Sequence, residues 1–340
     1  HHPLHSAGGR QDTRQMHGHR KTITPTGHLR AGLLISQTVM PSFTQWISAF
    51  RLRTLFLAVA TVVLGSALAW HEGAFSTITF LLALLLAVAI QILANLANDL
   101  GDFQKGTDIT GQRQGPTRAL QSGRISQKEM KRAVILFTIL CAVTGLALIW
   151  SATPFRDPSS AWIMTALGGG SILAALFYTM GKHAYGYRGW GDLFAFLFFG
   201  PVPVIGTWFL HTHETGFQPV LPAIGLGLIS TMILNVNNMR DIENDKASGK
   251  ITVAVKLGLP GAKVYHSLLT LISFVCFAGY NFLFEPAPWY RYAYLLVFLL
   301  PFKIVIELRH KEGEALDPYL KLTSLSGFLL AVTFALCSNL

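Results

Sequence analysis

The chain has 340 residues, of which 51% are hydrophobic and only 13% are charged. This balance argues against soluble domains and is typical of a protein that crosses a membrane several times. The formal net charge of +10 does not indicate a nucleic-acid-binding protein, because the basic residues are confined to short segments between hydrophobic stretches. We therefore expect a lipid bilayer, and no nucleic acid, as the surroundings of the chain.

The N-terminal segment differs in composition from everything that follows. His, Arg, Gly and Thr dominate up to Arg30, and no apolar core of a signal peptide follows the early charges. We expect a disordered extension over residues 1–45 and one membrane domain over residues 46–340. A metal-binding tail is the alternative for the histidines of this extension.

From Leu55 onward, hydrophobic stretches long enough to cross about 30 Å of hydrocarbon recur with short polar connections between them. The predicted fold class is an all-α integral membrane protein. Nine spans are expected, over residues 55–70, 77–97, 133–151, 161–180, 192–210, 219–236, 264–284, 292–306 and 323–339.

The basic residues predict the orientation in the membrane. They gather in the connections after the second, fourth, sixth and eighth spans, whereas the other connections between spans contain only Arg156 and Arg291. Lys and Arg are retained on the cytoplasmic side of membrane proteins. The N-terminus and those four connections are therefore predicted to face the cytoplasm.

A first acidic cluster follows the second span. Asn98 and Asp102 are four residues apart, so they share a helix face, with Asp99 beside them and Asp108 further along. On this evidence alone, acidic and amide side chains that cap a helix and remain hydrated are an equally good interpretation.

A second cluster follows the sixth span, on the same predicted side of the membrane. Asn237, Asp241 and Asp245 are spaced one helical turn apart. Two such rows facing each other offer hard oxygen ligands, which suit Mg²⁺ bridging to phosphate oxygens better than Zn²⁺. The pair of clusters predicts a magnesium and phosphate site.

A tightly bound phosphate also needs cations. Arg118 lies in a turn-rich segment that could fold over the phosphates, which makes it the first candidate. Each cation is also explained by the positive-inside rule alone. The candidates in these loops are Lys105, Arg113, Arg118, Arg124, Lys246 and Lys250.

Three further polar residues lie at the inner ends of spans. Tyr178 and Lys182 are one turn apart, and an interfacial aromatic residue beside a snorkelling lysine is their alternative interpretation. Asp192 begins the fifth span and could orient a hydroxyl or accept a proton, with a helix N-cap as the alternative.

From about Trp46 to Leu340, the sequence resembles the UbiA superfamily of intramembrane aromatic prenyltransferases, and within it the naphthoate branch. The matching segments are residues 51–55, 95–102, 185–192, 235–245 and 249–253. The chain departs from the family at Leu52, where relatives usually have proline. It also spaces Asp108 further from Asp102 than most relatives do, as the naphthoate branch does.

The resemblance implies nine transmembrane helices around a central cavity, with Mg²⁺ held by the two acidic motifs. The expected metal ligands are Asp99, Asp102, Asp108, Asp241 and Asp245. The expected catalytic residues are Asp102, Asp241, Lys182, Tyr178 and Asp192. The expected substrate-binding residues are Asn98, Arg118, Lys105, Arg113, Asn237, Lys246 and Arg51.

The implied activity is transfer of a polyprenyl chain from its diphosphate to 1,4-dihydroxy-2-naphthoate, with loss of CO₂ and diphosphate. It would serve menaquinone biosynthesis in the bacterial cytoplasmic membrane. A prenyltransferase for 4-hydroxybenzoate or homogentisate is the alternative within the family. From another class, a transporter of an anionic metabolite would require charged residues near the midplane of the bilayer.

Overall fold

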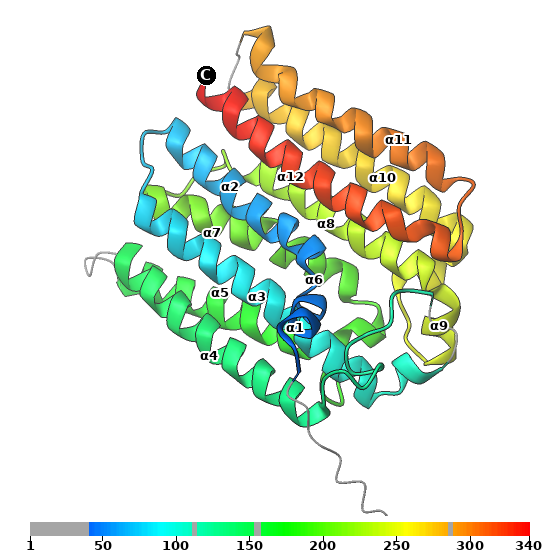
Figure 1. Ribbon diagram of the computed structural model, residues 1–340. Coiled ribbons are helices and arrows are strands. Elements are labelled where there is room, and N and C mark those ends of the chain that lie inside the picture. Colours follow the sequence, from blue (N-terminus) through cyan, green and yellow to red (C-terminus); the bar gives the residue numbers. More distant parts are fainter. Residues whose placement is uncertain (1–40, 111–113, 153–157, 285–287) are drawn as a thin grey trace, which may run out of the picture. The chain divides into compact units, whose positions relative to one another are not determined.

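The computed structural model describes residues 41–340 except 111–113, 153–157 and 285–287. The described residues form helices and no strand (Figure 1). The α-helices are α1 (Phe43–Phe50), α2 (Leu55–His71), α3 (Thr77–Gln104), α4 (Gln127–Ala152), α5 (Pro158–Phe177), α6 (Gly191–Phe198), α7 (Pro201–Thr212), α8 (Val220–Arg240), α9 (Ile242–Ala247), α10 (Val253–Phe284), α11 (Leu299–Leu308) and α12 (Asp317–Asn339). Short 3₁₀ helices are η1 (Leu52–Thr54), η2 (Thr107–Ile109), η3 (Tyr185–Arg188), η4 (Trp289–Phe298) and η5 (Gly313–Leu316).

The predicted all-α membrane fold is confirmed, with two differences in the predicted spans, of which the first concerns the eighth span. Within the described residues, eight helical stretches are long and apolar enough to cross a membrane. The expected span over 292–306 instead forms η4 followed directly by α11. Pro301 has no N–H to donate and is tolerated only in the first turn of an α-helix, which is where it lies in α11.

Aromatic side chains fill the interior between α7, α8, α10, η4 and α12. The rings of Phe277 and Phe334 lie 5.9 Å apart between centroids, and Tyr294 contacts both of them edge-on. The Tyr294 hydroxyl donates to the Phe277 carbonyl at 2.7 Å, so its polar end is satisfied inside the apolar interior. This packing fixes α8, which carries the second acidic motif.

The predicted fifth span is divided into α6 and α7 by Gly200 and Pro201. A Cβ atom on Gly200 would lie 2.4 Å from the Cα atom of Gly227 in α8. Only glycine permits so close an approach of the two backbones. At this break, the backbone between α6 and α7 therefore packs directly against the backbone of α8.

The ends of α3 and α8 that carry the acidic motifs lie at the same end of the helices, next to α9 (Figure 1). Thr110, after η2, donates from its hydroxyl to the Asn244 side chain in α9. The two motifs are thus side by side, as their predicted common side of the membrane requires. Most of the expected N-terminal extension, residues 1–40, lies outside the described residues, and α1 begins at Phe43.

Candidate active site

A cavity of about 360 Å³ lies between α2, α3, α4, α5, α6, α7 and α8. Its lining on α3 runs from Ala83 to Asp102, nineteen positions further along the helix, which corresponds to about 28 Å at 1.5 Å per residue. Small and apolar side chains line most of this length. The charged lining residues lie at the end formed by the acidic motifs, whereas uncharged polar residues such as Thr61 and Thr207 also line the cavity further along. The charged residues are Arg51, Arg53, Asp102, Arg118 and Lys250, with Asn98, Tyr178 and Asn237 beside them.

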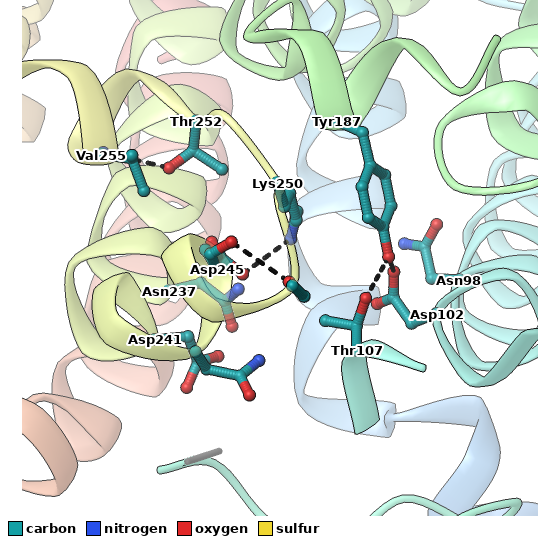
Figure 2. Close-up of polar contacts among 12 residues, drawn as sticks. Asn98, Asp102, Thr107, Tyr187, Asn237, Asp241, Asp245, Lys250, Thr252 and Val255 are labelled. Carbon is teal, nitrogen blue, oxygen red and sulfur yellow. Dashed lines mark hydrogen bonds and ion pairs between the residues drawn. The ribbon is translucent and has the colours of Figure 1, made fainter. Parts of the chain in front are cut away.

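Asp102 is held at both carboxylate oxygens. Arg118 donates from Nη1 to Asp102 Oδ2 at 2.5 Å, and the same nitrogen lies 3.3 Å from Asp108 Oδ2. The Tyr187 hydroxyl donates to Asp102 Oδ1 at 2.7 Å (Figure 2). Arg118 also donates to the Asn98 carbonyl at 3.1 Å, which ties its segment to α3.

The guanidinium of Arg118 remains charged despite its burial. Burial alone would lower its pKa, but the carboxylates of Asp102, Asp108 and Asp99 outweigh this effect and raise it. The phenol of Tyr178, also at the cavity, stays neutral because burial raises its pKa to about 12. The polar end thus presents a fixed positive charge beside a neutral hydroxyl.

In the second motif, Asp241 is paired with the neighbouring Arg240. Arg240 donates from Nε to Asp241 Oδ1 at 3.1 Å and from Nη2 to Oδ2 at 2.6 Å. It also donates to Asn237 Oδ1 at 2.9 Å and to Asp317 Oδ1 at 2.5 Å. The buried Arg240 therefore fixes the end of α8 to the start of α12.

Lys250 brings a second cation to the cavity from the loop after α9. Its Nζ atom lies 3.4 Å from Asp245 Oδ1, and both side chains are buried. Burial tends to lower the pKa of Lys250, but Asp245 and Asp102 raise it overall, so the ammonium persists. Burial raises the pKa of Asp245, and Lys250 opposes that shift.

The oxygen donors suit a magnesium ion shared with a phosphate group. Asp99 Oδ1 and Asp245 Oδ2 are buried and have no hydrogen-bond partner among the described residues. Within the described part of the chain, no group of three or more His, Cys, Asp or Glu residues is arranged to hold a metal by itself. Mg²⁺ commonly uses only one or two carboxylates together with substrate phosphates and waters, so this donor set is sufficient.

Three further predicted cations that the structure describes, Lys105, Lys182 and Lys246, lie away from the cavity lining. Lys105 and Lys182 border a separate, shallower pocket, and both are exposed. Lys246 is exposed and pairs with Glu243 at 2.9 Å. Arg113 lies outside the described residues.

Asp192 is buried beside the cavity without lining it. Its neighbour Gly191 is a lining residue, and Tyr265 of α10 donates a hydrogen bond to its carboxylate. The N-cap of α6 is Trp190, so the alternative role of Asp192 as an N-cap is wrong.

No role was predicted from the sequence for Tyr187 or Arg240. Lys250 was predicted only as one of six candidate cations for binding phosphate. Tyr187 lies in a segment that resembles the family, and Arg240 directly precedes Asp241. Neither position reveals its contact, because the hydrogen-bonded partners are far apart in the sequence. Tyr187 and Asp102 are 85 residues apart, and Arg240 and Asp317 are 77 residues apart. For Lys250, the preceding Gly249 was the only local signal of a turn.

Known proteins with similar sequences match most of the chain. The model of the UbiA prenyltransferase family matches residues 58–330. The 1,4-dihydroxy-2-naphthoate octaprenyltransferase of Escherichia coli (strain K12) is 40% identical over 291 residues, which cover 86% of this chain and 94% of that protein. The protein of the same name from Haemophilus influenzae is 37% identical over 294 residues, covering 86% and 94%.

Solved structures share the fold at low sequence identity. A UbiA homolog from Aeropyrum pernix K1 has a TM-score of 0.64 at 16% identity and covers 83% of this chain and 97% of its own. A UbiA homolog from Archaeoglobus fulgidus, solved with DMAPP and Mg²⁺, has a TM-score of 0.53 at 16% identity and covers 83% and 98%.

Proposed function

The chain belongs to the UbiA prenyltransferase family, and from this premise we propose that it transfers a polyprenyl chain to 1,4-dihydroxy-2-naphthoate. The donor is a polyprenyl diphosphate, and CO₂ and diphosphate are released. The relatives from E. coli and H. influenzae, which this chain matches over most of their length, carry the name of this activity.

The shape of the cavity is the observation that carries the proposal. One end holds Asp102, Arg118 and Lys250, and the remaining lining on α3, from Ala94 back to Ala83, is apolar apart from Gln91 and extends for about 16 Å. A polyprenyl diphosphate has the same division, with a charged head and a long hydrocarbon tail. The diphosphate would bind at the polar end and the prenyl chain in the apolar part.

Arg118 and Lys250 are assigned to the diphosphate. Both are cations at the polar end of the cavity, and the carboxylates around them keep both charged. They would stabilise the negative charge that develops as the allylic C–O bond breaks and its electron pair passes to the diphosphate oxygen. Tyr178, a neutral hydroxyl in the lining, is placed to donate a hydrogen bond to the same group.

The metal is proposed to be Mg²⁺, held by Asp102, Asp99 and Asp245. Asp99 and Asp245 each have one buried oxygen without a hydrogen-bond partner among the described residues. Asp241 would join them if its carboxylate left its ion pair with Arg240. When bound, Mg²⁺ supplies further neutralisation of the leaving diphosphate. The same combination of Mg²⁺ with a prenyl diphosphate is named for the Archaeoglobus neighbour.

The acceptor ring then forms the new carbon–carbon bond. The carboxyl-bearing carbon of the naphthoate attacks the allylic carbon, and the carboxyl group leaves as CO₂ with its bonding electrons returned to the ring. This step needs a dry pocket beside the polar end, where the lining includes the apolar residues Ala94, Phe194 and Leu234. No residue has to act as a strong base.

We further propose that the polar end faces the cytoplasm of a bacterial cell, in a cytoplasmic membrane crossed several times. The support is the distribution of Lys and Arg among the connections between the spans. The transporter alternative is disfavoured, because the charged residues of the cavity lie at one end rather than at mid-depth.

The test is a competition between acceptors. The protein purified in detergent is incubated with a polyprenyl diphosphate, Mg²⁺ and equal amounts of 1,4-dihydroxy-2-naphthoate, 4-hydroxybenzoate and homogentisate, and products are identified by mass spectrometry. We expect a prenylated, decarboxylated naphthoate that disappears with EDTA. A prenylated benzoate or homogentisate would support prenyl transfer but contradict the proposed acceptor. The absence of any product would contradict the proposed enzymatic activity.

A further inference from the structure

Tyr187 lies where the two acidic motifs approach each other, in η3 between α5 and α6. Its backbone is joined to the loop that follows the second motif, because the Ile251 amide donates to the Tyr187 carbonyl at 3.1 Å. The next residue toward the N-terminus, Gly186, donates to the Tyr178 carbonyl at 2.9 Å. A Cβ atom on Gly186 would lie 2.7 Å from that carbonyl oxygen, so η3 is tightly seated on the end of α5.

The hydroxyl of Tyr187 is hydrogen-bonded to the segment that carries the first motif. It donates to Asp102 Oδ1 at 2.7 Å, so its own oxygen must accept from Thr107 Oγ1, which lies at 2.5 Å. An ionised carboxylate can only accept, so the phenol supplies the proton of its bond to Asp102 Oδ1. Figure 2 shows the hydroxyl directed at both partners.

The ring of Tyr187 lies near one lysine from each side of the site, Lys105 beside the first motif and Lys250 after the second. Lys250 Nζ lies 5.8 Å from the ring centroid and Lys105 Nζ lies 4.9 Å from it. Both distances are within the roughly 6 Å at which an ammonium is attracted to an aromatic face. Since Lys250 also pairs with Asp245 at 3.4 Å, the ring is linked to the second motif through this lysine.

We propose that Tyr187 is a positioning residue that holds the two acidic motifs in register for a divalent cation. Its hydroxyl fixes the orientation of the Asp102 carboxylate, and its ring keeps Lys250 beside Asp245. The inference rests on the proposed function, because it assumes that these carboxylates serve a metal and a diphosphate. Partners that orient a ligating carboxylate typically change metal affinity by about 10- to 100-fold when they are removed.

The change Tyr187→Phe removes the hydroxyl and keeps the ring. Asp102 Oδ1 then loses its donor, and the carboxylate can turn toward Arg118, which already binds the other oxygen. Thr107→Val removes the hydrogen bond to the Tyr187 oxygen with little change of shape, and a smaller effect in the same direction is expected. Tyr294→Phe is the matched control, because it removes another buried hydroxyl, bonded to the Phe277 carbonyl, away from the cavity.

The experiment measures Mn²⁺ binding by electron paramagnetic resonance, with Mn²⁺ in place of Mg²⁺. The full chain is titrated in detergent with and without inorganic diphosphate. We expect Tyr187→Phe to raise the Kd for Mn²⁺ by about 10- to 100-fold, Thr107→Val to raise it less, and Tyr294→Phe to leave it unchanged. Melting temperatures close to that of the parent would show that the variants are folded.

Two results would overturn the inference: an unchanged Kd in Tyr187→Phe, or no Mn²⁺ binding by the parent under either condition. An equal rise in Tyr294→Phe would also overturn it, since the effect would then be one of general packing. Failure of the proposed function can be told apart from failure of this inference. If the parent binds Mn²⁺ in a manner that depends on Tyr187 but forms no prenylated product, the proposed reaction is wrong and the role of Tyr187 stands.

Discussion

Asp102 is the residue at which the contacts of the polar end converge. It lines the cavity and is bonded by both Arg118 and Tyr187. The carboxylate is therefore already oriented, and few degrees of freedom remain to be fixed when a metal and a diphosphate bind. This pre-organisation makes the charge of Asp102 the most sensitive single feature of the site.

Asp102→Asn should lower kcat by at least about 100-fold, because it removes the charge of a proposed metal ligand while keeping its shape and hydrogen-bonding capacity. The measurement is prenyl transfer at saturating substrate, with the melting temperature recorded to establish folding. Glu243→Gln is the matched control, since Glu243 is exposed and does not line the cavity. Near-normal turnover in Asp102→Asn would contradict the assigned metal site.

Lys250→Met should destabilise the protein in a pH-dependent manner. Removal of the cation leaves Asp245 as a buried, unpaired carboxylate, and breaking such a pair costs about 3 kcal/mol. Because burial raises the pKa of Asp245, protonation on acidification removes the buried charge. The loss of melting temperature should thus be large at pH 8 and smaller at pH 5. Equal losses at both pH values, or the same pattern in the exposed Lys246→Met, would contradict this.

At the scale of the elements, most of the fold could be predicted from the sequence because crossing a bilayer requires long apolar stretches. The exceptions depend on contacts between distant segments. In the 3₁₀ helix η4, the Tyr294 hydroxyl donates a hydrogen bond to the Phe277 carbonyl in α10. No local sequence pattern reveals this contact. Similarly, the break at Gly200 is explained by its contact with Gly227 of α8.

Gly200→Ala should destabilise the protein by about 1–3 kcal/mol, because the added methyl group would overlap the backbone of α8. The measurement is thermal unfolding in detergent. Gly169→Ala in α5 is the control, since nothing lies within 4 Å of its added Cβ atom. A Gly200→Ala variant as stable as the Gly169→Ala variant would contradict the close approach of α7 and α8.

At the scale of the whole molecule, the two acidic motifs could be predicted from the sequence because residues one turn apart share a helix face. Arg118, which lines the cavity, could be predicted because it lies in a turn-rich segment. The partners that orient them could not. Tyr187, Arg240 and Lys250 act through contacts that exist only after the helices have assembled. The cavity likewise depends on which faces of the helices meet, so its apolar lining was not predictable residue by residue.

The depth of the cavity predicts how donor length affects the reaction. Ala83 lines the cavity far from Asp102 along α3. Ala83→Phe should therefore reduce turnover of long polyprenyl diphosphates and leave that of geranyl diphosphate close to the parent value. The measurement is competition between donors of different lengths, analysed by mass spectrometry. An unchanged preference would mean that the prenyl chain does not extend to this end of the cavity.

The most direct test of the assigned reaction follows the acceptor's carboxyl carbon. The protein is supplied with 1,4-dihydroxy-2-naphthoate labelled with ¹⁴C in the carboxyl group, a polyprenyl diphosphate and Mg²⁺, and labelled CO₂ and free diphosphate are measured together. We predict equal amounts of the two products and the loss of both in Asp102→Asn. Diphosphate released without labelled CO₂, or a prenylated product that retains the label, would contradict the account.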